Sequence, residues 1–343
     1  MTSVKPVSGW SQSRAPTIRD VAASAAVSVA TVSRVINDSA RVSPETRARV
    51  LTAIEDLDFR RSSTARNLSI GRSHGIGVIA PFFTTPSVVE RLRGVVGGLA
   101  GRGYDLLLFD VEAPEQRADA LRDFARRDRL DGLIVISLPF SDAEVERLGR
   151  AGLPVVLVDV AHPQLPHIVI DDVHGGRLAT EHLLAKGHRR IGFLGDVPEN
   201  PFGFTSSEYR RRGYELALRD AGIEPVDDLV RLGPYGLDEA RPLAEALLRR
   251  DDPPTAIFAA SDMQAVGVLR CARALGLRVP QDIAVIGFDD IDVADILELS
   301  TVRQPLWASG ARAAEALLLA IEGGRAQPVR QLEPLAVVER ATT

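Results

Sequence analysis

Cysteine is nearly absent from this chain, since Cys271 is the only one among 343 residues. A single thiol cannot form an internal disulfide or a thiolate cluster, and such usage is typical of a reducing compartment. Long apolar runs are also missing, so no segment reaches the length of a membrane span. The first 16 residues are polar and lack the apolar core of a secretory signal. We therefore expect a cytoplasmic protein with no membrane partner and a disordered tail at 1–16.

The sequence also lacks the short motifs of common catalytic and nucleotide-binding sites. Gly94–Gly103 is glycine-rich, but it does not fit G-x-G-x-x-G and lies inside a helical pattern. Neither G-x-x-x-x-G-K-[ST] nor G-x-S-x-G occurs, and the 6 histidines show no metal-ligand spacing with a carboxylate. Asp289 and Asp290 are adjacent on one strand end, so their side chains should point apart. We expect no enzyme activity, no cofactor and no bound metal.

Charge is distributed unevenly along the chain. Residues 1–75 hold 11 of the 41 Lys and Arg but 6 of the 46 Asp and Glu, so this part is basic and the rest is acidic. A basic head on an acidic body points to a polyanionic partner for the head. A split of this size can also arise by chance, so charge alone leaves the question open.

A short stretch near the N-terminus has the pattern of a helix that enters a DNA groove. Val27–Asn37 reads VSVATVSRVIN, in which Ser28 is a good N-cap and apolar residues recur at i, i+3 and i+4 from Val32. The opposite face has short side chains and ends in a cation. A second amphipathic pattern precedes it, starting at the capping-box-like Thr17–Asp20. Two short helices joined by such a tight turn predict a helix-turn-helix.

The next segment predicts a third helix and then a linker. Ser43–Glu45 supplies a cap, a proline at the first helical position and an acidic first turn. Apolar residues from Val50 onward, with Phe59 at the end, would close a small three-helix core. Arg60–Ser73 is basic and serine-rich, and it cannot build a core of its own. We therefore expect this linker to be disordered when the protein is alone.

From Gly75 onward, apolar strands alternate with amphipathic helices. The expected strands are Ile76–Ala80, Leu106–Asp110, Leu133–Ser137, Val155–Val158, Ile168–Ile170, Ile191–Leu194, Leu229–Leu232, Ala256–Ala260, Ile283–Gly287 and Leu335–Val338. The expected helices include Val88–Ala100, Gln116–Arg127, Arg177–Lys186, Ser207–Ala221 and Met263–Leu275. Such alternation is typical of parallel sheets covered on both faces. Because the strands are too many for one ordinary sheet, we expect two doubly wound lobes.

The stretch Thr17–Phe59, TIRDVAASAAVSVATVSRVINDSARVSPETRARVLTAIEDLDF, resembles the DNA-binding headpiece of the LacI/GalR family of bacterial transcription regulators, and the resemblance continues to about residue 340. It implies an all-α helix-turn-helix headpiece followed by an α/β two-lobed effector domain of the periplasmic-binding-protein type I fold. The implied parts are a headpiece at 17–59, a hinge helix or linker at 60–74, and an effector-binding and dimerisation domain at 75–343. Lobe 1 would comprise 75–171 and 304–328, and lobe 2 would comprise 172–303 and 329–343. Chain crossings between the lobes are expected near Ile170–Asp172, Val302–Pro305 and Ala326–Arg330.

The resemblance implies roles in DNA binding for named residues. Val29 and Ala30 match the family's main specificity pair and can contact a thymine methyl, while Arg34 can bond bidentately to guanine. The short donors suited to phosphates are Thr17, Ser28, Thr31, Ser33 and Asn37. Leu68 matches a hinge leucine that wedges into the minor groove. The alternatives are that Leu68 packs on the next domain and that Arg34 is a solvated surface arginine.

The turn departs from the family pattern at Ala26, where many members have glycine. If this position needs a positive φ, alanine costs about 1 kcal/mol. The implied partner is pseudo-palindromic operator DNA, read by a homodimer whose two heads contact two half-sites. The broad apolar surface of Val88–Ala100 could contribute to pairing the subunits.

A ligand site is expected between the lobes, at the carboxyl ends of strands. Asp289, Arg210 and Tyr235 match effector-binding positions of the family, whereas Asp262 is interpreted as a helix cap and Tyr235 could instead be a surface ring. The full set of candidates is Asp289, Arg210, Tyr235, Ser206, Phe204, Ser261, Ser87 and Val88. Many members carry paired phenylalanines where this chain has Ser87 and Val88, which should open space in the cleft. Carboxylates, an arginine, hydroxyls and aromatic faces suit a polyol, so a sugar is the leading effector.

These observations predict a repressor whose operator affinity is controlled by a small molecule. The rival interpretation is a soluble ligand-binding protein of the periplasmic sugar-binding class with no regulatory role. A secretory signal would favour that interpretation, and the basic head would have no use in it.

Overall fold

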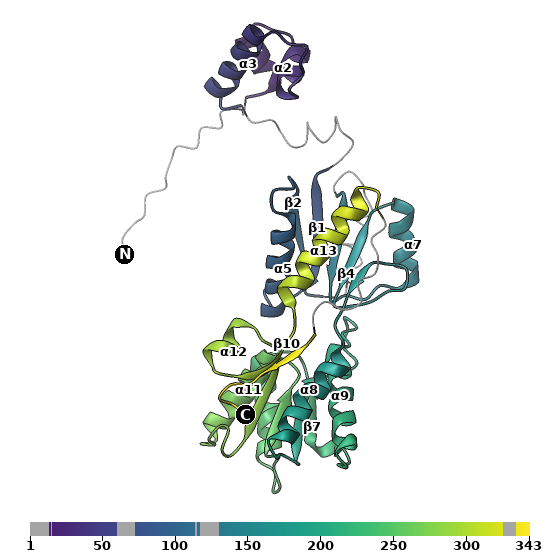
Figure 1. Cartoon of the computed structure of the whole chain (residues 1–343), viewed down its shortest axis with the longest axis vertical. Helices are drawn as coiled ribbons and strands as arrows, with labels where there is room; N and C mark the ends of the chain where they lie inside the picture. The colour runs from purple at the N-terminus through teal and green to yellow at the C-terminus, as the bar shows by residue number, and fades with distance from the viewer. Residues whose placement is uncertain (1–13, 15, 60–72, 114, 117–129, 325–333) are drawn as a thin grey trace, which may run out of the picture. The chain divides into compact units, whose positions relative to one another are not determined.

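The computed structural model describes residues 14, 16–59, 73–113, 115–116, 130–324 and 334–343 (Figure 1). The chain divides into two compact units, Met1–Ser73 and His74–Thr343, and each is considered by itself. Several sequence predictions fall outside the described residues: the tail but for Arg14 and Pro16, Leu68 and most of the linker at 60–74, the helix expected at Gln116–Arg127 beyond its first residue, and the crossing expected at Ala326–Arg330.

The smaller unit is a three-helix bundle made of α1 (Ile18–Ser24), α2 (Val29–Ile36) and α3 (Pro44–Asp56). Ser28 caps α2 by accepting a hydrogen bond from the Thr31 N–H at 3.2 Å, and Ser43 caps α3 through the Thr46 N–H at 3.3 Å. A small shared core holds the helices together, and its most deeply buried side chains are Val21, Val32 and Val50. The predicted all-α helix-turn-helix unit is confirmed.

The larger unit contains two sheets, of which the first has five parallel strands in the order β2-β1-β3-β4-β5. The strands are β1 (Gly75–Pro81), β2 (Asp105–Val111), β3 (Gly132–Ile136), β4 (Val155–Val158) and β5 (His167–Ile168). One face of this sheet packs against α5 (Pro86–Leu99) and α13 (Leu306–Ile321), and the other packs against α7 (Asp142–Ala151). We call this layer lobe 1.

Glycines let α5 and α13 approach closely, and the two helices run side by side in Figure 1. A Cβ atom at Gly94 would clash with the carbonyl oxygen of Trp307, and one at Gly310 would clash with the carbonyl oxygen of Arg91. The glycine-rich stretch that fits no nucleotide motif therefore has a packing role, since it lies mostly in this helix contact.

The second sheet has six strands in the order β11-β10-β9-β8-β6-β7, and we call it, with its helices, lobe 2. Its strands are β6 (Ile191–Asp196), β7 (Val230–Gly233), β8 (Ala256–Ala259), β9 (Ala284–Asp289), β10 (Ser300–Arg303) and β11 (Ala336–Val338). All neighbours are parallel except the β10–β11 pair. The helices are α8 (Asp172–Ala185) and α9 (Ser206–Asp220) on one face, with α10 (Leu237–Leu248), α11 (Asp262–Ala274) and α12 (Asp292–Ile296) on the other. The two-lobed α/β fold is confirmed.

Two elements beside the expected crossings differ from the sequence predictions. Ser300–Arg303 forms β10, which pairs with β9, so the chain passes to lobe 1 through Gln304 and Pro305 instead of through the whole of Val302–Pro305. This strand was missed because STVR has too few apolar residues to stand out. Asp172 begins α8, with Asp171 as its cap, so this helix starts five residues before the expected Arg177. Among the described helices, none combines the length and apolar character needed to cross a membrane.

Candidate DNA-reading helix and interlobe cavity

The surface of α2 divides as its sequence predicts. Val32 and Val35 are buried in the core, while Val29, Ala30 and Arg34 are exposed. Within the described part of the chain, Arg34 has no ion-pair partner, so its guanidinium is free to bind an outside acceptor. The three candidates for base contact therefore lie on the helix face that is available to a partner.

Four of the five candidates for phosphate contact lie at a helix end or in a first turn, and some already have local partners. The Thr17 N–H donates to Asp20 Oδ2 at 2.7 Å, and the Thr17 hydroxyl donates to the same oxygen at 2.6 Å. Ser28 and Thr31 share a hydroxyl contact of 2.9 Å at the start of α2. Ser33 is half-buried within α2, and Asn37 is the exposed C-cap of that helix.

The turn between α1 and α2 passes through Ala26, whose φ is +54°. A positive φ places the Cβ atom too close to the backbone, and glycine is the residue that avoids this cost. Ala26 therefore has the positive φ at which an alanine is expected to strain the turn.

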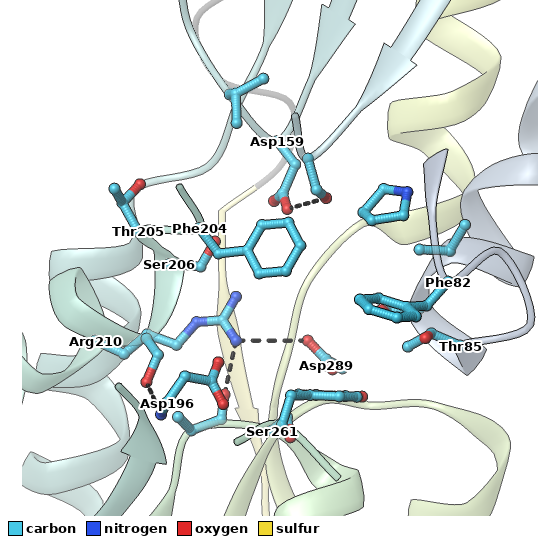
Figure 2. A pocket seen from close by; sticks show the side chains of 18 of the residues that line it. Phe82, Thr85, Asp159, Asp196, Phe204, Thr205, Ser206, Arg210, Ser261 and Asp289 are labelled. Carbon is cyan, nitrogen blue, oxygen red and sulfur yellow. Dashed lines mark hydrogen bonds and ion pairs between the residues drawn. The ribbon is translucent and has the colours of Figure 1, made fainter. Parts of the chain in front are cut away.

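A cavity between the two lobes collects residues that follow the carboxyl ends of strands (Figure 2). Phe82 follows β1, Ser137 follows β3 and Asp159 follows β4 on the side of lobe 1. On the side of lobe 2, Asp196 ends β6 and Asp289 ends β9. Parallel strands present their carboxyl ends at one edge of a sheet, so the fold itself brings these side chains together.

All eight effector candidates line this cavity. Arg210 comes from α9 and Asp289 from the end of β9, and both are buried. Tyr235 follows β7 and is 40% exposed, so it is neither buried nor a freely solvated ring. The others are Phe204 and Ser206 before and at the start of α9, Ser261 after β8, and Ser87 and Val88 in the first turn of α5.

Arg210 is held in place by several contacts. Its Nε donates to Asp172 Oδ1 at 2.7 Å, and its Nη1 donates to the Ala260 carbonyl oxygen at 2.7 Å. The same Nη1 lies 3.8 Å from Asp289 Oδ1, and the guanidinium carbon lies 3.7 Å from the centre of the Phe288 ring. This fixed geometry presents a positive group beside two carboxylates at the wall of lobe 2.

A second arginine stands on the side of lobe 1. Arg91 of α5 is 4% exposed, and its Nη2 donates to Asp159 Oδ1 at 2.8 Å. The Ser137 hydroxyl donates to the other oxygen of Asp159 at 2.7 Å. Gln304, in the crossing segment, accepts from Arg91 at 3.2 Å and donates to Asp289 Oδ1. A chain of hydrogen bonds therefore joins the two lobes next to the cavity.

Burial shifts the acid–base equilibrium of these carboxylates. It raises the pKa of Asp172 to about 6 although Arg210 opposes the change, and it also raises the pKa of Asp289. Burial works in the same direction on Asp159, but Arg91 and Ser137 outweigh it, so the pKa of Asp159 lies below its ordinary value. Asp159 is thus ionised and paired, whereas Asp289 is a carboxylate that further hydrogen-bond donors would stabilise.

Aromatic rings from both lobes close one side of the cavity. The Phe82 ring of lobe 1 meets the Phe202 ring of lobe 2 edge to face at a centroid distance of 5.2 Å, and Phe202 stacks on Phe204 at 5.3 Å. Asn200 fixes this loop, because its side-chain amide donates to the Phe204 carbonyl oxygen and accepts from the Phe204 N–H, both at 2.8 Å. The loop at 200–204 therefore reaches the cavity, and Phe204 is part of its lining.

One sequence interpretation at this site is wrong. Ser261, and not Asp262, caps α11, since its hydroxyl accepts from the Gln264 N–H at 3.2 Å. Asp262 is fully buried and accepts hydrogen bonds from Thr301 at 2.6 Å and from the Ile291 N–H at 3.0 Å. It therefore joins β10 to the loop after β9. Asp289 and Asp290 do point apart, because Asp290 pairs with Arg303 and Arg340 instead.

Other lining residues were not identified from the sequence. They include Asp159 and Ser137 on lobe 1, Asp196 on lobe 2, and Arg91 and Gln304 at the junction. The signal that could have found Asp159 and Asp196 is their position directly after an apolar strand. Arg91 lies within an apolar helix pattern and Gln304 in a crossing, so neither position stands out. Among the described residues, no group of three His, Cys, Asp or Glu side chains is arranged to hold a metal ion.

Comparison with known proteins gives the same picture for both units. Residues 17–62 match the family described as bacterial regulatory proteins, lacI family, and residues 180–343 match the periplasmic binding protein-like domain. The ribose operon repressor of Escherichia coli (strain K12) is 35% identical over 336 residues, which cover 95% of this chain and 99% of that protein. The HTH-type transcriptional regulator CelR of Thermobifida fusca is 34% identical over 328 residues, covering 92% and 95%.

Solved structures agree over nearly the whole chain. A complex of the transcriptional regulator CelR with cellobiose is similar at a TM-score of 0.71 and 32% identity, and the alignment covers 96% of this chain and 100% of that one. The lac repressor dimer bound to operator and the anti-inducer ONPF is similar at a TM-score of 0.83 and 28% identity, with coverage of 96% and 99%.

Proposed function

The chain belongs to the lacI family of bacterial regulatory proteins, and we propose that it is a transcriptional repressor whose operator affinity is set by a sugar bound between its two lobes. The observation that carries the proposal is the meeting of eight predicted residues in one interlobe cavity, in a chain whose headpiece also exposes one face of α2. The rival interpretation is a transport-type binding protein, and it gives the headpiece no function.

On the DNA side, α2 enters the major groove of one half-site. Arg34 donates two hydrogen bonds to a guanine, and Val29 and Ala30 pack against a thymine methyl. The short donors at 17, 28, 31, 33 and 37 contact phosphates and set the register. Leu68 of the linker at 60–74 wedges into the minor groove. We propose the same domain bounds, with the headpiece at 17–59, the linker at 60–74 and the effector domain at 75–343.

The active species is a homodimer, because two headpieces are needed to read a pseudo-palindromic operator. A relative of similar fold is described as a dimer bound to operator. On α5, Val89 is 38% exposed and Val96 is 55% exposed, although Val88, Leu92 and Val95 of the same helix are buried. These exposed valines supply apolar area for the contact between subunits.

On the ligand side, the cavity supplies the groups that a sugar needs. Carboxylates such as Asp289 accept hydrogen bonds from hydroxyls, Arg210 donates to sugar oxygens, and the ring of Phe204 or Tyr235 covers the apolar face of the sugar. Two relatives are named for cellobiose and ribose, which supports a sugar without identifying which one binds here.

The switch follows from the position of the cavity. A ligand can shift a conformational equilibrium only if it binds one arrangement of the lobes more tightly than another. Closure of the lobes around a sugar alters the spacing of the two linkers in the dimer, and both linkers must become ordered together on the DNA. Ordering them costs conformational entropy, so a small change in spacing shifts operator affinity. Release of DNA by the sugar is the expected sign.

The test is a thermal-shift screen of sugars, purines and nucleosides on the purified protein. A bound compound raises Tm in proportion to its saturation of the native state. Sugars should give the shift, and Asp289→Ala should abolish it. An undiminished shift in Asp289→Ala would move the site elsewhere, and a shift given by nucleosides alone would contradict the sugar assignment.

A further inference from the structure

The charged groups that line the cavity are not evenly paired. Arg91 lies 2.8 Å from Asp159, and Arg210 lies 3.8 Å from Asp289. Arg210 is also engaged by Asp172 behind the wall, at 2.7 Å. Among the residues that the structure describes, no basic nitrogen lies within ion-pair distance of Asp196. The cavity thus holds one carboxylate more than its two arginines can pair.

Asp196 is held in a fixed orientation although it lacks a cation. Its Oδ1 accepts from the Gln264 side-chain amide at 2.8 Å, and Gln264 is itself held by Ser261 at 3.0 Å. The Asp196 N–H donates to the Ser207 hydroxyl at 2.8 Å, which anchors the end of β6 to α9. Figure 2 shows Asp196 beside Arg210 and below Phe204, within the cavity. Asp196 Oδ2 accepts no hydrogen bond from the described residues, so it is available to a ligand.

The side of lobe 1 carries an unmet donor. Arg91 is 4% exposed, and its Nε has no hydrogen-bond partner among the described residues. An unpaired buried donor of this kind is unfavourable, and its burial keeps it out of reach of a molecule in the cavity. The cavity therefore offers a free acceptor on lobe 2, Asp196 Oδ2, whereas Arg91 Nε is buried inside lobe 1.

From this arrangement we infer that the effector is an uncharged, polyhydroxylated molecule and that Asp196 is the residue that selects it over acidic or phosphorylated sugars. This deepens the proposed function and rests on it. A hydroxyl can donate to Asp196 Oδ2, so a neutral polyol satisfies this acceptor without bringing a charge into the cavity. A phosphate or carboxylate on the ligand has no proton to donate, and it meets Asp159, Asp196 and Asp289 against two arginines. An ammonium group would satisfy Asp196, but the positive charge of Arg210 nearby would repel it.

The experiment compares ligands that differ in charge on wild type and two variants. The probes are ribose, glucose and cellobiose, with glucose 6-phosphate, glucuronate and glucosamine as charged counterparts, and binding is measured by calorimetry and thermal shift. Asp196→Asn keeps the shape and removes the charge, while Asp251→Asn makes the same change at an exposed site of lobe 2. Wild type and Asp251→Asn should bind at least one neutral sugar and reject the charged counterparts.

Asp196→Asn should lose at least about tenfold in affinity for that neutral sugar, because a hydrogen bond to a charged acceptor is replaced by a weaker one. The ratio of its affinity for neutral sugars to its affinity for anionic sugars should also fall. Tight binding of glucose 6-phosphate or glucuronate to wild type would overturn this inference and leave the sugar effector in place. If Asp196→Asn binds the neutral sugar as tightly as wild type does, this inference is likewise overturned and the sugar effector stays in place. Failure of every sugar, neutral and charged, would contradict the proposed function and this inference with it.

Discussion

Gln304 donates a hydrogen bond from its side-chain amide to Asp289, and its amide oxygen accepts from Arg91 at 3.2 Å. Asp289 belongs to lobe 2 and Arg91 to lobe 1, while Gln304 lies in the segment that crosses between them. A single buried side chain therefore ties the ligand cavity of one lobe to helix α5 of the other. The lobes cannot change their relative position without disturbing these contacts.

Replacing Gln304 with leucine should weaken the response to ligand more than the binding of ligand. The change leaves Asp289 with one donor fewer and Arg91 with one acceptor fewer, which should lower the free energy of unfolding by about 1–3 kcal/mol. The change in operator affinity caused by sugar should shrink by about 0.5–2 kcal/mol. Urea unfolding and operator titration with and without sugar measure the two effects. Gln281→Leu, at an exposed position, is the control, and equal behaviour of the two variants would count against the coupling role.

Ala26→Gly should stabilise the smaller unit by about 1 kcal/mol, because glycine adopts the positive φ of this turn without strain. Thermal unfolding followed by circular dichroism would show the change in the transition of the three-helix unit. Ala23→Gly, in the exposed part of α1, is the matched control and should destabilise by about 0.5–1 kcal/mol. Destabilisation by Ala26→Gly would show that the turn is not strained.

Arg34→Ala should cost about 1–3 kcal/mol of operator binding and relax the preference at one base position. Arg34→Lys should recover part of the affinity but not the preference, since lysine lacks the planar fork of donors. Arg49→Ala removes the same charge from the exposed surface of α3 and should leave the base preference unchanged. The measurement is selection from a randomised operator library, followed by titration. Identical sequence preferences in wild type and Arg34→Ala would remove Arg34 from the reading face.

Asp196 should make the stability of the ligand-free protein depend on pH. Burial raises its pKa from 3.8 to about 6 in the folded state, so the folded protein holds this proton more tightly than the unfolded chain does. The groups facing it are Arg210, Asp289, Tyr235 and Gln264. The stability that protonated Asp196 contributes is present below pH 4 and is lost as the pH rises through about 6.

Asp196→Asn should therefore raise the free energy of unfolding at pH 7.5 by about 1–2 kcal/mol, and the gain over wild type should disappear near pH 4. Urea unfolding at several pH values measures the difference, with Asp251→Asn as the control for net charge. The raised pKa values of Asp172 and Asp262 affect wild type and variant alike, so the difference reports on Asp196 together with its interaction with Asp289. A gain that does not change with pH would contradict the assigned burial of this carboxylate.

Local signals in the sequence predicted the helices of the headpiece and most strands of the larger unit. Ser28 and Ser43 form caps through their own hydroxyls, and such short-range chemistry can be inferred without the rest of the fold. Strand β10 was missed because its pairing with β9 depends on long-range contacts and not on an apolar run. The glycines of α5 gave no positive signal, since their role depends on where α13 lies.

The ligand site was predictable only where a local signal or the family resemblance marks a residue. Arg210 and Asp289 could be placed by resemblance, and the positions of strand ends explain why they meet. Gln304 gave no signal, and the position of Asp196 at a strand end does not distinguish it from other strand-end carboxylates. The importance of both residues depends on the partners that they have and lack in three dimensions. A carboxylate after a strand is usually a cap or a surface group, and its lack of a cation becomes visible in the folded structure alone.

The most direct test of the account is to recover genomic DNA fragments with the purified protein at moderate salt, with and without a sugar that raises its Tm. We predict selective recovery of a small set of fragments that share a pseudo-palindromic site, and a loss of recovery when the sugar is present. Recovery of no fragment in preference to bulk DNA, with or without sugar, would contradict the claim that this chain is a ligand-controlled DNA-binding regulator.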